Sequence, residues 1–286
     1  MKPAVFSYHR PSSLDAVLAL LAEYGYDAKV IAGGQSLGPM MNMRFAQPMQ
    51  VIDLNSVPEL SGVSRSGDTL RVGAMTRHHE VATDLQVRDA CPLLAAAAAT
   101  VGHYAIRQRG TLGGSLAHAD PAAQLPLVAV TLGARIQVAG PNGTREIAAA
   151  EFPQAAMMTV LEPEEIITAV HFPCRVAGEG HGFELFNRRH GDFAIASCAV
   201  TASVTDGVLA TLRLGVGAVG DVPVALDALA DSFIGAQASP QTFGQIAEAA
   251  AAAVEPLDNP QISAEYRRDL VKALCMRALT RACRRA

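Results

Sequence analysis

Apolar residues at helical spacing mark the first element of the chain. They recur at i, i+3, i+4 and i+7, as Leu14, Val17, Leu18 and Leu21. This spacing places them on one face and predicts an amphipathic helix, with Ser12 as its cap and Gly25 at its end. Short apolar runs at residues 29–32 and 51–54 predict two buried strands after it.

The middle of the chain mixes strand and helix patterns. Residues 70–74 alternate apolar and polar side chains after a turn at 66–68, which predicts a hairpin. The alanine-rich segment 91–101 predicts a closely packed helix. The other elements expected here are a helix at 122–132 and strands at 135–138, 144–147 and 165–170.

The pattern changes after about residue 176. Three longer strands are expected at 183–186, 194–204 and 208–219, with Asp206-Gly207 as a tight turn between the last two. Helices are expected at 224–234, 241–253 and 263–285. Because strands and helices do not alternate regularly in the first half, we predict an α+β fold rather than a doubly wound parallel sheet.

Composition and charge narrow the function. The 286 residues are 50% hydrophobic and 17% charged, with a net charge of −4, which argues against bulk disorder and against nucleic-acid binding. No apolar run is long enough to span a membrane and the start lacks the pattern of a secretion signal, so we expect a cytoplasmic protein. The five cysteines show no C-x-x-C spacing and no histidine has ligand spacing, so we expect no metal on this chain.

Two glycine-rich turns carry the candidate chemistry, at residues 32–37 and 109–116. Neither has the glycine spacing of the dinucleotide fingerprint, and Pro39 stands where a phosphate loop needs lysine. Backbone amides and the Ser36 and Ser115 hydroxyls are then the donors available to two phosphates of one dinucleotide. The alternative is that both are tight turns between packed strands.

The two turns and their flanks resemble the FAD motifs of a known family. Residues 32–41 resemble the first FAD motif, and residues 107–122 the second, of the flavoprotein (medium) subunits of molybdenum-containing hydroxylases, the xanthine dehydrogenase, carbon monoxide dehydrogenase and quinoline oxidoreductase type. Residues 6–11 and 188–194 fit the same family. The resemblance extends over essentially the whole chain, in order and at the family's spacing.

This resemblance implies a fold and a set of cofactor contacts. The fold would be a two-subdomain FAD-binding module (PCMH/VAO-type) at 1–55 and 56–176, followed at 177–286 by a three-stranded antiparallel sheet with three helices. Turn residues would hold the diphosphate, Asp120 would lie near the ribityl chain, Leu161 near the pyrimidine edge and Phe193 against the isoalloxazine. The expected cofactor-binding residues are Ala32, Gly33, Gly34, Gln35, Ser36, Leu37, Thr111, Gly113, Gly114, Ser115, His118, Asp120, Leu161 and Phe193.

Several positions depart from the family or leave alternatives open. Gln124 stands where relatives commonly have an acid, and Leu185 lies where some place a lysine near the flavin. Phe193 could instead be a core aromatic. The histidines at 78, 79 and 103 are expected at the surface or in a partner contact.

The resemblance also implies a function. The chain would be an electron-transfer subunit without catalytic acid or base, in a complex with a small [2Fe–2S] subunit and a large molybdopterin subunit that forms a dimer of heterotrimers. Electrons would pass from the iron–sulfur cluster to FAD and then to an external acceptor. Two alternatives are a self-contained flavin oxidase or reductase and a scaffold subunit that has lost FAD. The substrate and the acceptor are not encoded in the motifs.

Overall fold

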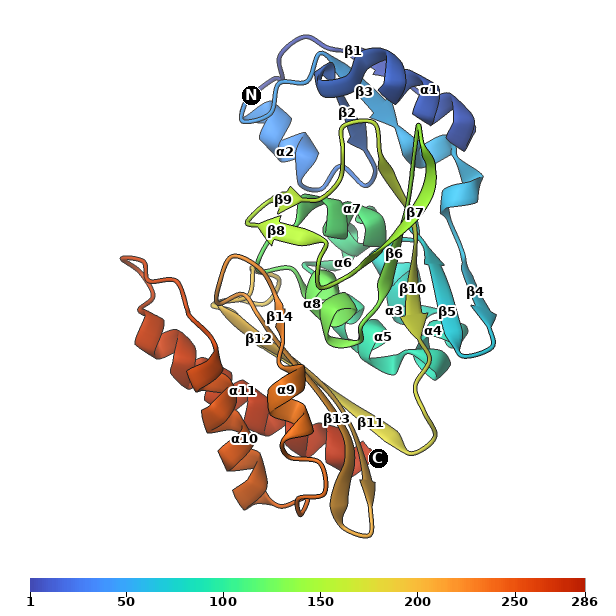
Figure 1. The fold of residues 1–286 in the computed structure, drawn as a ribbon. Coiled ribbons are helices and arrows are strands. Elements are labelled where there is room, and N and C mark those ends of the chain that lie inside the picture. The colour runs from blue at the N-terminus through green and yellow to red at the C-terminus, as the bar shows by residue number, and fades with distance from the viewer. Residues whose placement is uncertain (286) are drawn as a thin grey trace.

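The computed structural model describes residues 1–285, without the side chain of residue 285. Three parts follow one another from the blue N-terminus to the red C-terminus, each built on its own sheet (Figure 1). Each part has its own cluster of buried apolar side chains. The mixture of helices and sheets agrees with the predicted class.

The N-terminal part is a small parallel sheet covered by helices. Its strands, in spatial order, are β1 (Ser7–His9), β3 (Gln50–Asp53) and β2 (Ala28–Ile31). Its helices are α1 (Leu14–Tyr24) and α2 (Leu37–Asn42), with 3-10 turns at Gly25–Asp27, Leu54–Ser56 and Pro58–Leu60. The predicted cap of α1 was wrong by one residue, because the hydroxyl of Ser13, not Ser12, accepts the Ala16 amide. Gly25 ends the helix at a φ of 49°, as expected.

The central part is an antiparallel sheet with helices packed on it. The strands, in spatial order, are β4 (Val63–Ser66), β5 (Thr69–Gly73), β10 (Ile166–Pro173), β6 (Arg135–Gly140) and β7 (Gly143–Ala148). A separate hairpin joins β8 (Pro153–Ala155) to β9 (Met158–Thr159). The helices are α3 (His78–Thr83), α4 (Leu85–Ala90), α5 (Pro92–Ala99), α6 (Tyr104–Arg107), α7 (Leu112–His118) and α8 (Gln124–Thr131).

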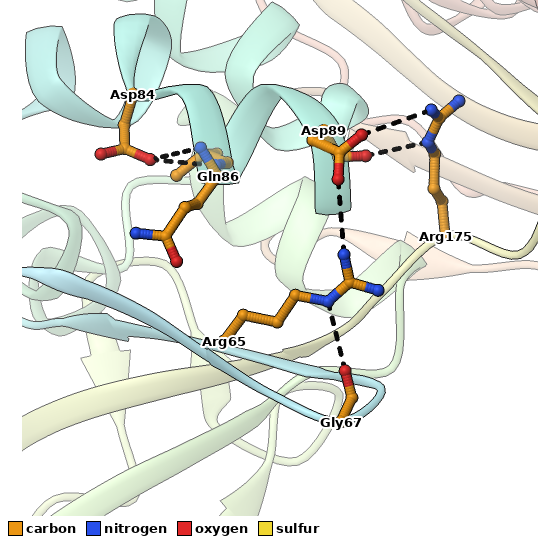
Figure 2. A network of polar contacts seen from close by, with 7 residues as sticks. Arg65, Gly67, Asp84, Gln86, Asp89 and Arg175 are labelled. Atoms are coloured by element: carbon orange, nitrogen blue, oxygen red, sulfur yellow. Dashed lines mark hydrogen bonds and ion pairs between the residues drawn. The ribbon is translucent and has the colours of Figure 1, made fainter.

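A polar network links the central sheet to the helix beside it (Figure 2). The Asp89 carboxylate at the end of α4 pairs with Arg65 of β4 at 3.4 Å and with Arg175 at 3.7 Å. Arg175 also donates from Nε to the Asp89 carbonyl at 2.8 Å. Asp84 caps α4 by accepting the amides of Gln86 and Val87. Both ion pairs are largely exposed, so each contributes little to stability.

The C-terminal part is a second antiparallel sheet with helices on one face (Figure 1). Its strands are β11 (Glu179–Phe186), β12 (Ala196–Thr205), β13 (Val208–Gly217) and β14 (Val224–Ala225). Its helices are α9 (Asp227–Asp231), α10 (Pro240–Ala253) and α11 (Ala264–Arg285). The predictions of three strands and of a helix from 224 were wrong here, because Val224 and Ala225 extend the sheet by pairing with Val216 and Gly215.

The C-terminal sheet also packs against the central part. Gly215 on β13 leaves room for Thr131 of α8, because a Cβ on Gly215 would lie only 3.1 Å from the Thr131 Cβ. The Ala218 amide donates to the Pro121 carbonyl at 3.0 Å. The helix α8 and the segment before it therefore both contact the C-terminal part. Within residues 1–285, no helix combines the length and the apolar character that crossing a membrane requires.

Gly182 tests how tightly the C-terminal part is packed. A Cβ at Gly182 would lie 2.8 Å from the Ala278 carbonyl carbon, so Gly182→Ala should push α11 away from β11 and lower the free energy of unfolding by about 1–3 kcal/mol. Gly244 on α10 has no atom within 4 Å of its added Cβ, so Gly244→Ala should be neutral or stabilising. Urea denaturation measures both, and equal effects would contradict this packing.

Candidate functional site

The two glycine-rich turns lie in direct backbone contact. The first glycine loop (residues 32–37) connects β2 to α2, and the second glycine loop (residues 109–116) leads into α7. A Cβ on Gly33 would lie 2.8 Å from the Cα of Gly110 and closer still to the Arg109 carbonyl oxygen. A Cβ on Gly114 would lie 3.6 Å from that of Ala32. Any side chain at position 33 would collide with the backbone of residues 109–110, so glycine is required there for the two loops to lie this close.

The first glycine loop presents free backbone donors. The amides of Gly33, Gly34, Gln35 and Ser36 have no hydrogen-bond partner among residues 1–285. Two carbonyls of the loop are tied back, since Asn55 Nδ2 donates to Ala32 O and Gln35 Nε2 to Gly33 O, each at 2.9 Å. A planar trans peptide points its N–H opposite to its C=O. These bonds therefore turn the Gly33 N–H away from the Asn55 side chain and the Gly34 N–H away from the Gln35 side chain. Gly34 has a φ of 68°, which supports the sharp turn.

Successive free amides of this kind form a concave anion-binding site. Gln35 therefore shapes the loop with its side-chain amide, and its contribution to a ligand is left to its backbone N–H. Ser36 is the N-cap residue just before α2, and its hydroxyl makes no capping hydrogen bond to the helix. Leu37 is the first residue of α2.

The second glycine loop differs in its hydrogen bonds. Gly113 N donates to Ala74 O at 2.8 Å, Gly114 N to Thr111 Oγ1 at 3.1 Å, and Ser115 N to Thr111 O at 3.0 Å. The expectation that these amides bind a phosphate does not agree with these bonds, because each N–H has only one hydrogen to give. Gly113 is buried against Ala74, where an added Cβ would lie 2.6 Å from the Ala74 side chain. This loop offers a bare backbone surface and the Ser115 hydroxyl.

His78 is hydrogen-bonded to the backbone of the second glycine loop. The prediction of a surface position was wrong, because His78 is 6% exposed. Its Nε2 donates to the Thr111 carbonyl at 2.8 Å and its backbone amide to the Gly110 carbonyl at 2.9 Å. Burial, the largest effect, lowers the pKa of His78 to about 4, so the ring is neutral at pH 7.

Two residues that the sequence analysis did not identify each contact one glycine loop: Asn55 bonds to the first and Arg77 to the second. The Arg77 guanidinium donates to the Arg109 carbonyl and to the Asn55 Oδ1. Burial lowers the pKa of Arg77, yet an arginine stays charged at neutral pH. One available signal was the position of Asn55 just after β3, because carboxyl ends of neighbouring parallel strands share an edge.

The other predicted residues lie around this centre. The Asp120 Oδ1 accepts the Ala122 amide at 2.8 Å, and Asp120 borders a small pocket with Leu116, Pro126, Phe152 and Pro223. His118 ends α7. Leu161 is half-buried, and its amide donates to Thr159 Oγ1 at 3.3 Å.

Phe193 is not a core aromatic. It lies in the segment between β11 and β12 and is 72% exposed. Its ring is therefore available for a contact outside this chain's own core. Gln124 is buried at the start of α8, and Leu185 is half-buried on β11. No cluster of three His, Cys, Asp or Glu side chains suited to a metal occurs in the described part of the chain.

Comparison with known proteins matches two consecutive segments of the chain to two family models. Residues 4–175 match the FAD binding domain in molybdopterin dehydrogenase, and residues 181–282 match the CO dehydrogenase flavoprotein C-terminal domain. The nicotine 6-hydroxylase medium subunit of Paenarthrobacter nicotinovorans is 40% identical, over 99% of this chain and 99% of that protein.

Solved structures agree with this assignment over the full length. The carbon monoxide dehydrogenase of Hydrogenophaga pseudoflava, in a form lacking the Mo-pyranopterin moiety, superposes with a TM-score of 0.96 at 36% identity, covering 100% of both chains. Quinoline 2-oxidoreductase from Pseudomonas putida 86 gives 0.94 at 36% identity, covering 99% of this chain and 98% of that chain.

The buried His78 ring predicts a pH dependence of stability. Its pKa of about 4 in the folded chain lies below the ordinary histidine value of 6.5, so the unfolded chain binds more protons between these values. The free energy of unfolding should fall as pH drops from 6.5 toward 4, by about 3 kcal/mol more than in His78→Gln. Urea denaturation across this range measures the difference, and parallel curves for the two proteins would contradict a neutral buried ring.

Proposed function

Since the chain belongs to the family of FAD-binding medium subunits of molybdenum-containing hydroxylases, we propose that it passes electrons through FAD from an iron–sulfur partner to an external acceptor. It is an oxidoreductase subunit, and residues 4–175 form its FAD-binding domain. The observation that carries the proposal is the first glycine loop. It has four unpaired backbone amides, and it lies so close to the second glycine loop that no side chain fits at Gly33.

The described residues fit the diphosphate of FAD. A diphosphate diester carries two negative charges, and oriented N–H groups can meet them without a lysine in the loop. We assign the closer phosphate to the amides of Gly33, Gly34, Gln35 and Ser36, with Ala32 and Leu37 flanking them. The second phosphate would lie along the bare Gly114 surface, within reach of the Ser115 hydroxyl, while Thr111 and Gly113 hold that loop in shape.

The rest of the cofactor would extend over the remaining predicted residues. His118 and Asp120 would lie near the ribityl chain, and the backbone at Leu161 near the pyrimidine edge. Phe193 would cover one face of the isoalloxazine, in agreement with its exposure. The units proposed for this binding are FAD-binding subdomains at 1–55 and 56–176 and a C-terminal domain at 177–286.

The chain's own residues bind and orient in this account. FAD supplies the redox chemistry, since it can take up and release electrons one or two at a time. The glycine loops fix the diphosphate, and through it the position of the ring relative to its partners. No side chain on this chain is assigned as a general acid or base.

The partners are proposed from the relatives. Their names describe a medium chain and a subunit of a dehydrogenase complex, which supports the presence of partner subunits. We propose that these are a small [2Fe–2S] subunit and a large molybdopterin subunit, in a dimer of heterotrimers. Nicotine, caffeine and quinoline in those names suggest an N-heteroaromatic substrate for the complex. We propose that the complex works in the cytoplasm, where the five free cysteines would stay reduced.

Gly33 and Gly38 form a matched pair for testing FAD binding. Gly33→Ala places a methyl group against the Arg109 carbonyl and must separate the loops, so FAD affinity should fall by about tenfold to hundredfold. Gly38→Ala adds the same methyl group where nothing lies within 4 Å, so it should bind FAD like the wild type. Flavin absorbance of the purified chain and titration of the apoprotein with FAD measure both variants.

Two outcomes would contradict the proposal. A wild-type chain that binds no FAD, even on titration, would remove the assigned cofactor. A Gly33→Ala chain with unchanged affinity would instead place the diphosphate elsewhere. Turnover of an organic substrate by the isolated chain would favour a self-contained flavoenzyme.

A further inference from the structure

One arginine is bonded directly to the second glycine loop and, through Asn55, to the first. Arg77 lies just before α3, outside either loop. Its guanidinium donates from one terminal nitrogen to the Arg109 carbonyl of the second loop and from the other to Asn55 Oδ1. Asn55 Nδ2 in turn donates to the Ala32 carbonyl of the first loop at 2.9 Å. This chain of bonds, here called the Arg77 clasp, therefore joins Ala32 to Arg109 through two side chains.

We propose that the Arg77 clasp is a positioning device that presets the first glycine loop for the FAD diphosphate; this rests on the function proposed above. Holding the Ala32 carbonyl toward Asn55 turns the Gly33 N–H to the opposite side of the same peptide plane. Gly33 N–H is one of the four unpaired amides. Arg77 and Asn55 thus act on the ligand through the backbone.

The surroundings of Asn55 fix the orientation of its amide. Asp53 Oδ1 accepts both the backbone N–H of Asn55, at 2.8 Å, and its Nδ2. Burial raises the pKa of Asp53, but hydrogen bonds from Tyr8 and Asn55 and the nearby Arg10 outweigh it and hold the pKa below its usual value. A carboxylate on one side and a guanidinium on the other leave Nδ2 as the only end of the amide that can face Ala32 O.

The geometry calls for arginine at position 77. The two bonds leave from two nitrogens of one planar guanidinium, which holds them at a fixed spacing and angle. A lysine ammonium keeps the charge as a single point on a flexible stem. Arg77→Lys therefore retains the positive charge near the loops and removes the fork.

Asn55→Asp separates positioning from general support. The variant is isosteric and keeps Oδ1, so its bond to Arg77 gains a full negative charge. It replaces the donor to the Ala32 carbonyl by an oxygen that repels it. Asn55→Asp also removes the Nδ2 bond to Asp53 Oδ1 and adds a negative charge near the loop, so the uncharged Asn55→Ser is measured beside it, and the clasp predicts weaker FAD binding in both.

The experiment titrates FAD into the full apoprotein and records 31P NMR of the bound diphosphate. Arg77→Lys and Asn55→Asp should each lower FAD affinity by about tenfold, the effect of losing one hydrogen bond to a preset backbone. Both should also shift the diphosphate resonances while the visible flavin spectrum stays unchanged. Arg65→Lys and Asn259→Asp are controls, because their side chains serve the Asp89 network of Figure 2 and an exposed turn.

Each result decides between explanations. Wild-type affinity and unshifted 31P resonances in both clasp variants would overturn the clasp while leaving FAD binding intact. Weakened binding in Arg77→Lys with wild-type behaviour in Asn55→Asp would also overturn it, because Arg77 would then act without Asn55. A wild-type chain without FAD would instead refute the proposed function. Thermal unfolding of each apoprotein shows whether the variant folds. If Asn55→Asp does not fold, the test at position 55 rests on Asn55→Ser.

Discussion

The structure depends on the backbone contact between Gly33 and residues 109–110. The first glycine loop follows a strand of the N-terminal sheet and the second lies between two helices of the central part, yet they approach more closely than any side chain would allow. Close approach of two backbones normally leaves polar groups unpaired, which is unfavourable unless partners are supplied. Here Arg77, Asn55, Gln35 and His78 each bond to a carbonyl of one loop. The amides of the first loop remain for a ligand.

The two loops are therefore unequal. The first has a row of free donors, whereas the second uses its amides to start α7 and to bond to Ala74. The neutral His78 ring beneath the second loop adds no charge that would attract an anion. The C-terminal part also contacts the segment after α7, since the Ala218 amide donates to the Pro121 carbonyl. A hydrogen-bonded loop beside a loop with free amides suits the proposed cofactor, whose ring must stay at one distance from its partners.

The sequence was sufficient for the class of fold and for the location of the two glycine loops. Helical spacing identified α1, and the Asp206-Gly207 turn identified the β12–β13 hairpin, because both signals are local. The roles of Arg77 and His78 could not be predicted, since their partners lie up to 33 residues away and no local motif marks them, whereas Asn55 had one signal in its position just after β3. The exposure of Phe193 and the short strand β14 depended on tertiary contacts in the same way.

A crystal structure of the full chain with FAD bound tests the central claim most directly. The account predicts diphosphate oxygens at about 2.7–3.2 Å from the amide nitrogens of the first glycine loop, with Ala32 O still bonded to Asn55. A diphosphate bound away from residues 33–36, with those amides facing solvent, would contradict it.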